Sequence, residues 1–132
     1  SIRGEAAVRF GLCQSAAEAE SVTPYTPFVA MVEPCATATL RATCIFMQRL
    51  HKAYPVTGSI ATAAAARLPG TLAHEVSRDT GTRVAIAHPS GVMDVVTEVV
   101  EDPAELKKAV LVRTARRLME GSVLIPWSVW HK

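Results

Sequence analysis

The feature that most constrains the fold of this chain is a run of small residues near its middle, TGSIATAAAARLPG, at residues 57–70. Alanine has the highest helix propensity, so the run predicts a helix over about residues 57–68 that stops at Pro69-Gly70. Apart from Arg67, this helix has almost no polar side-chain atoms, and a helix that is apolar nearly all round is buried. Its small side chains let strands approach closely. The run therefore predicts a sheet wrapped around a central helix.

The segments on both sides of this helix carry the apolar and β-branched residues that are typical of strands. One pair flanks HPSG, residues 88–91, whose proline, serine and glycine favour a tight turn and hence an antiparallel hairpin. A short helix is expected over residues 4–12. The predicted strands are residues 28–33, 36–46, 82–87, 92–100, 108–114 and 118–125. Together these elements predict the α+β class, with a curved and mostly antiparallel sheet.

Size and composition exclude several classes of protein. A chain of 132 residues can bury a single core, so we expect one domain over residues 1–132. Its 49% hydrophobic and 20% charged residues are ordinary for a soluble globular protein. No segment approaches the ~20 apolar residues of a membrane span. The net charge of +2, with scattered basic residues, argues against a nucleic-acid-binding face.

The three cysteines, Cys13, Cys35 and Cys44, predict free thiols and a cytoplasmic protein, because their number is odd and their spacing does not fit a metal site. Cys35 follows Pro34 in an expected loop and should be the most exposed of the three. We therefore expect no metal site in this chain.

The turn that leads into the alanine helix is a candidate anion site. A helix N-terminus has unpaired N–H groups and a partial positive charge, which together attract carboxylates and phosphates. The small residues Thr57, Gly58 and Ser59 would let an anion reach those N–H groups. An ordinary helix start, capped by the hydroxyl of Thr57 or Ser59, accounts for the same residues, so both interpretations are open.

Three stretches resemble the PrpF-type isomerases, a family that includes 2-methylaconitate, methylitaconate and 4-oxalomesaconate isomerases. They are LHKAYPVTGSIATAAAARLPGT, AHPSGVMDV and VRTARRLMEGSVLIP, in that order between residues 50 and 126. The resemblance implies a diaminopimelate-epimerase-like fold, with two similar domains and an active site between them. This chain would correspond to the carboxy-terminal domain alone, with the amino-terminal domain absent, as in a fragment, a natural truncation or a split protein.

The same resemblance bears on the chemistry. In the epimerase relatives a cysteine introduces the helix turn within a Cys-Gly-Thr-Gly-Ala pattern, whereas here Pro55 occupies the place of the cysteine. Proline cannot transfer a proton, so a mechanism with one acid/base thiol in each half is excluded. The family's isomerases carry a key cysteine and lysine in the amino-terminal domain. The resemblance implies a cofactor-independent 1,3-proton shift in an unsaturated di- or tricarboxylate, with this half binding carboxylate and inactive alone.

The candidate substrate-binding residues gather around the turn and the hairpin. His51 and Lys52 precede the turn and would steer a polycarboxylate by charge, although a solvated loop accounts for them equally well. No catalytic residue is expected in this chain; His88 is the weak candidate, and a structural hydrogen bond is the preferred role for it. The substrate-binding set is Thr57, Gly58, Ser59, Lys52, His51 and Ser90.

An alternative to the isomerase half is a non-catalytic binding or assembly module that retains the fold. Such a module would pair with itself or with another chain through the surface that faces the missing domain, and that surface should be apolar. A homodimer is natural because the family's two domains are related by pseudo-symmetry. In that setting Arg113 and Arg116 fit charges at a sheet edge or domain interface better than substrate ligands.

Overall fold

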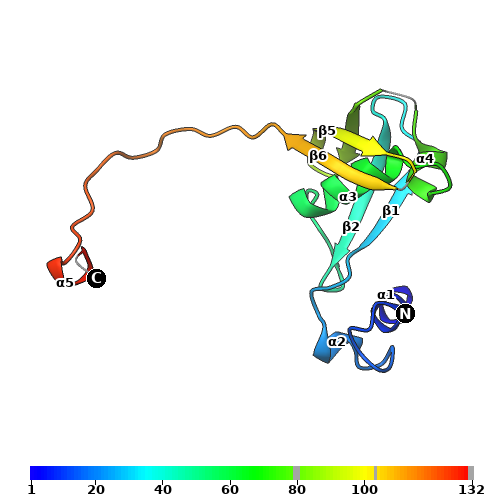
Figure 1. Cartoon of the computed structure of the whole chain (residues 1–132), viewed down its shortest axis with the longest axis horizontal. Coiled ribbons are helices and arrows are strands. Elements are labelled where there is room, and N and C mark those ends of the chain that lie inside the picture. Colours follow the sequence, from blue (N-terminus) through cyan, green and yellow to red (C-terminus); the bar gives the residue numbers. More distant parts are fainter. Residues whose placement is uncertain (79–80, 103, 131–132) are drawn as a thin grey trace.

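The computed structural model describes residues 1–78, 81–102 and 104–130, and its central part is a sheet that curves over one helix (Figure 1). The strands are β1 (Val29–Glu33), β2 (Leu40–Phe46), β3 (Arg49–Leu50), β4 (Arg83–His88), β5 (Gly91–Val100) and β6 (Glu105–Leu111). The helices are α1 (Ile2–Arg9), α2 (Ala19–Val22), α3 (Val56–Ala66), α4 (Leu72–Val76) and α5 (Trp127–Trp130).

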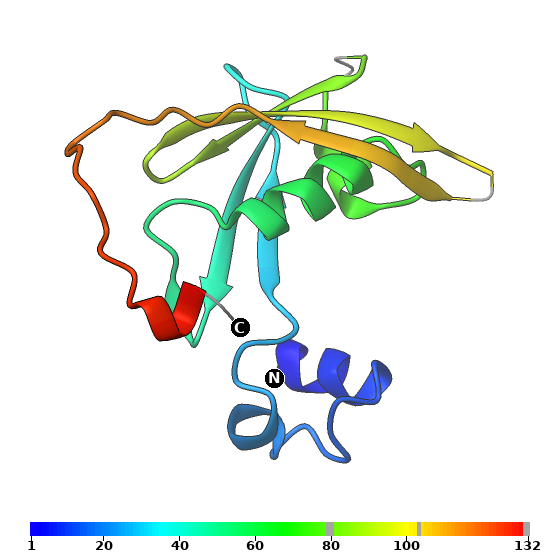
Figure 2. The same ribbon diagram turned by 60° about the vertical axis from the view of Figure 1, so that its left-hand side comes forward.

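The strands form one mixed sheet in the order β1-β2-β4-β5-β6, and β3 pairs with β2 beside this path. Neighbouring strands are antiparallel except β2 and β4, which are parallel and pair Leu40 with Ile86. Between these two strands the chain crosses over through α3 and α4. The sheet bends around α3 in both views, so the predicted α+β class and the curved sheet around a central helix are confirmed (Figure 2).

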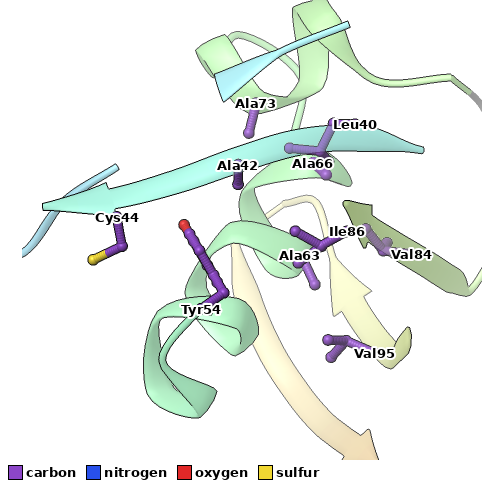
Figure 3. Close-up of a cluster of buried hydrophobic side chains, with 10 residues drawn as sticks. All are labelled: Leu40, Ala42, Cys44, Tyr54, Ala63, Ala66, Ala73, Val84, Ile86 and Val95. Atoms are coloured by element: carbon purple, nitrogen blue, oxygen red, sulfur yellow. The ribbon is translucent and has the colours of Figure 1, made fainter. Parts of the chain in front are cut away.

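The core lies between the concave face of the sheet and one side of α3 (Figure 3). Helix α3 buries Ser59, Thr62, Ala63 and Ala66, which are spaced as one face of a helix. The expectation that this helix is buried on most faces is wrong, because Ala61, on its other side, is exposed. The sheet covers α3 from one side only and leaves the other side open. The sheet and its flanks contribute Leu40, Ala42, Cys44, Tyr54, Ala73, Val84, Ile86 and Val95 to this core.

Helices α1 and α2 pack against each other as a small unit beside the sheet. In α1, a Cβ added to Gly4 would lie 2.6 Å from the carbonyl oxygen of Ala16, so only glycine allows this close approach. Ala7 and Ala19 are fully buried there. The predicted helix over residues 4–12 is confirmed with earlier bounds, since α1 ends before Gly11, which has a positive φ of 69°.

The last predicted strands differ most from the structure. Residues 108–114 were expected to be a strand, and β6 lies earlier, at Glu105–Leu111, because it pairs with β5 directly after a short turn. The strand expected at residues 118–125 is not formed: residues 112–126 are extended but have no regular structure. This segment leaves β6 and runs away from the sheet (Figure 1). In the described part of the chain, no helix is long and apolar enough to cross a membrane.

Candidate anion site at the start of helix α3

Helix α3 begins with an open N-terminus. Its first flanking residue is Pro55, which is extended (φ −63°, ψ 139°) and makes no side-chain cap. The first helical bond runs from the Ser59 amide to the Pro55 carbonyl at 2.8 Å. Within the described residues, the amides of Val56, Thr57 and Gly58 have no hydrogen-bond acceptor. The helix end therefore keeps its partial positive charge and three free donors.

The expected hydroxyl caps are not formed. The Ser59 side chain is fully buried and donates a 2.7 Å hydrogen bond to the Val56 carbonyl, so it stabilises the first turn from inside. Thr57 is exposed and caps nothing. The physical reason is that the helix starts at Val56, so Thr57 and Ser59 both lie inside its first turn, whereas a cap at Thr57 or Ser59 would need the helix to start at Gly58 or Ile60. An anion at this end would meet amides, with the Thr57 hydroxyl beside them.

The tip of the β4–β5 hairpin lies against the loop that leads into α3. The hydroxyl of Ser90 donates a hydrogen bond to the carbonyl of Lys52, which joins residues 38 positions apart in the chain. The Ser90 amide donates to Nδ1 of His88 at 3.2 Å. In the facing loop, the Ala53 amide donates to Nδ1 of His51, also at 3.2 Å. The two histidines thus have matching roles, each closing its own turn.

These hydrogen bonds select the tautomer that each imidazole has in its neutral form. A ring nitrogen that accepts an amide N–H carries no proton, so Nε2 carries the proton of each neutral ring and is a donor. Burial, together with the charge of nearby His51, lowers the pKa of His88 below its ordinary value. His88 is therefore neutral at pH 7. It is a neutral donor rather than a positive charge at the hairpin tip.

A groove of about 350 Å³ lies between the first turns of α3 and the strands β1 and β2. The hydroxyls of Tyr54 and Thr62 share a 2.8 Å hydrogen bond on its wall, and burial raises the pKa of Tyr54. Burial likewise raises the pKa of the Cys44 thiol, which keeps it protonated. The groove is mostly apolar. Its lining residues are Thr26, Pro27, Phe28, Ala30, Cys44, Tyr54, Thr57, Gly58, Ala61 and Thr62.

The structure brings most of the predicted site residues to one place. His51, Lys52, His88 and Ser90 lie where the loop before α3 meets the hairpin tip. Sequence reasoning missed Tyr54 as a wall of the groove, although its position inside the turn sequence was a usable signal. Arg113 and Arg116 lie on the segment after β6, which has no regular structure, and within the described part of the chain they make no hydrogen bond or ion pair with these residues.

Among the described residues that line the groove, Cys44 is the one cysteine. Cys35 was expected to be the most exposed and is only 6% exposed, because it packs with Ala38 and Ala87. Hydrogen bonds from Thr37, with smaller contributions from Ala38 and Arg41, lower the pKa of Cys35. Among the described residues, no group of three or more histidine, cysteine or acidic side chains is placed to hold a metal ion.

Comparisons with known proteins agree with this architecture. The family model described as "PrpF protein" matches residues 1–126. The 3-methylitaconate isomerase of Eubacterium barkeri is 38% identical over 140 aligned positions, covering 94% of this chain and 36% of that protein. The 2-methyl-aconitate isomerase of Shewanella oneidensis is 33% identical, covering 95% of this chain and 35% of that protein.

A solved structure gives the same result in three dimensions. The crystal structure of a methylitaconate-delta-isomerase superposes with a TM-score of 0.79 at 38% identity, over 92% of this chain and 35% of that one. The chain thus spans about a third of the length of the curated relatives it matches.

Proposed function

The chain belongs to the PrpF family, and we propose that it provides the carboxylate-binding part of an isomerase acting on an unsaturated di- or tricarboxylate. Support comes from the relatives named above, which are isomerases of 3-methylitaconate and 2-methyl-aconitate. The alternative of a non-catalytic module is not favoured, because no relative named here has such a role.

The observation that carries the proposal is the open end of α3, where the free amides of Val56, Thr57 and Gly58 lie near the Lys52 loop. A substrate carboxylate at this point would accept N–H hydrogen bonds and be neutralised by the helix end and the Lys52 ammonium group. The adjoining groove would hold the carbon skeleton. Its apolar wall suits the unsaturated, methyl-bearing chain of such acids.

The proposed reaction is a 1,3-proton shift. A base removes a proton from the carbon next to the double bond, the double bond moves by one position, and a proton returns two carbons away. In the intermediate, the negative charge is shared by the two end carbons of the allylic system and by a carboxylate attached to one of them, where preorganised N–H donors stabilise it most. Pro55 has no proton to exchange, and His88 is bound through Nδ1 to its own turn. The base and acid would therefore come from the part of the PrpF fold that lies outside these 132 residues, and the chain alone would not turn over substrate.

Amide chemical-shift titration tests the binding role. Addition of trans-aconitate to the isotope-labelled chain should move the signals of Val56, Thr57 and Gly58 first. Lys52→Ala should weaken this response, while Arg49→Ala, on exposed β3, serves as the matched loss of a positive charge and should leave it unchanged. Shifts confined to other regions would contradict the proposal, as would isomerisation of the acid by the purified chain.

A further inference from the structure

The segment after β6 leaves backbone polar groups without hydrogen bonds and apolar side chains exposed to solvent. Within the described part of the chain, residues 113–125 make no backbone hydrogen bond, although they are extended (Figure 1). The side chains of Val112, Leu118, Met119, Val123 and Leu124 are 81–93% exposed. Contiguous apolar exposure on this scale marks an interaction surface, and free N–H and C=O groups in an extended chain are a template for sheet pairing.

The order of residues in this segment fits a strand with one buried face. Side chains alternate between the two faces of a strand. Positions 119, 121, 123 and 125 are Met, Gly, Val and Ile, so one face is entirely apolar or glycine. Positions 118, 120, 122 and 124 are Leu, Glu, Ser and Leu, so the opposite face is mixed. This contrast is typical of a strand that covers a hydrophobic core on one side.

The comparisons indicate where that core lies. The family match extends to residue 126, so the segment belongs to the PrpF fold rather than to an unrelated extension. The chain itself covers only 36% of the isomerase of Eubacterium barkeri. No strand of the described residues pairs with the segment. We therefore expect its partner strand in the part of the PrpF fold that this chain does not cover.

We propose that residues 117–125 add as a β-strand to the edge of a sheet in the part of the PrpF fold that these 132 residues do not include. Met119, Val123 and Ile125 then face the core of that partner. The segment is thus a docking strand that joins the two parts of the enzyme through backbone hydrogen bonds and one apolar face. This inference rests on family membership and not on the proposed carboxylate binding.

Hydrogen exchange tests the docking strand directly. The 132-residue chain is mixed with a polypeptide made of the part of the Eubacterium barkeri 3-methylitaconate isomerase that the chain does not match. Alone, residues 117–125 should exchange at the rate of an unfolded peptide. In the complex their exchange should slow by at least about a hundredfold, which corresponds to a few stable hydrogen bonds. No substrate is present, so failure of carboxylate binding would not affect this measurement.

Two neighbouring substitutions give a matched pair. Val123→Asp places a charge on the apolar face and should weaken association by about tenfold or more. Ser122→Asp adds the same charge one position earlier, on the mixed face, and should weaken it by less than about threefold. Circular dichroism of both variants checks that the sheet around α3 is intact. The proposal is overturned by an absent complex, by a segment that stays unprotected in the complex, or by equal effects of the two variants. It is also overturned if the segment is protected in the chain alone through self-association.

Discussion

Strand β5 and the segment at residues 118–125 have similar patterns but different structures. Both alternate apolar side chains with polar ones, and both predict a strand. Strand β5 is paired on both sides, with β4 and with β6, and its Val95 is fully buried. Among the residues that the structure describes, the later segment pairs with no strand, and most of its apolar side chains are exposed. The difference shows that an alternating pattern determines which face of a strand is buried. Whether the segment forms a strand at all depends on a partner strand that pairs with it.

The largest expected effect contrasts one leucine in each region. Leu40 is fully buried in β2, and Leu118 is exposed in the unpaired segment. Leu40→Ala should lower the free energy of unfolding by about 2–5 kcal/mol, through lost burial and a cavity. Leu118→Ala should change it by less than about 0.5 kcal/mol. Urea unfolding of the isolated chain measures both, and comparable losses would show that the segment packs on the sheet.

Thr97 and Thr114 give the next contrast. The Thr97 hydroxyl is fully buried in β5 and has no hydrogen-bond partner among the described residues. Thr97→Val removes this unsatisfied group and should raise the free energy of unfolding by about 1–2 kcal/mol. Thr114→Val, in the exposed segment, should have no measurable effect. A destabilised Thr97→Val variant would indicate that the hydroxyl has a partner after all, such as a bound water.

A smaller effect is expected at the hairpin tip. Ser90→Ala removes the hydrogen bond to the Lys52 carbonyl and should cost about 0.5 kcal/mol, because the residue is exposed. Ser122→Ala is the matched control in the unpaired segment and should cost nothing. In hydrogen exchange, Ser90→Ala should also speed the opening of the loop around Lys52. Unchanged exchange there would mean that the bond does not tie the two loops together.

The smallest effect is a dependence of stability on pH. The pKa of His88 is lowered in the folded chain by burial and by the charge of His51. The unfolded chain therefore binds a proton at this residue at a higher pH than the folded chain does, so stability rises with pH in this window. This contribution is complete above a pH of about 6.5 and is lost as the pH falls from there towards the folded pKa. Thermal unfolding between pH 7 and pH 5 should show the decline, and His88→Gln should reduce it.

The parts of the fold that could be predicted are those set by local sequence. The alanine run defines α3, and the HPSG turn defines the β4–β5 hairpin, because helix propensity and turn chemistry act over a few residues. The one-sided burial of α3 was missed, because it depends on how far the sheet extends around the helix. The burial of Cys35 was missed for a similar reason, since Ala87 packs on it from a distant strand.

The candidate site was predictable as a set of residues but not as an arrangement. Thr57 and Gly58 follow from the turn sequence, and His51, Lys52, His88 and Ser90 were selected as its neighbours. The hydrogen bond between Ser90 and Lys52 depends on the parallel pairing of β2 with β4, which no local pattern reveals. The absence of a side-chain cap on α3 depends on a helix start that lies a few residues before the predicted caps, which is finer than propensity can define.

The short parallel pairing of β2 with β4 has a mechanical consequence. Strands β1, β2 and β3 form one ribbon, β4, β5 and β6 form another, and Leu40–Ile86 and Arg41–Ala87 are the register pairs that join them. Lys52 follows the first ribbon, and Ser90 is at the tip of the second. A small rotation about this seam would change the spacing between the Lys52 loop and the hairpin tip more than any distance within either ribbon. The width of the proposed anion site would therefore follow the angle between the two ribbons, and the bond from Ser90 to the Lys52 carbonyl ties the Lys52 loop to the hairpin tip.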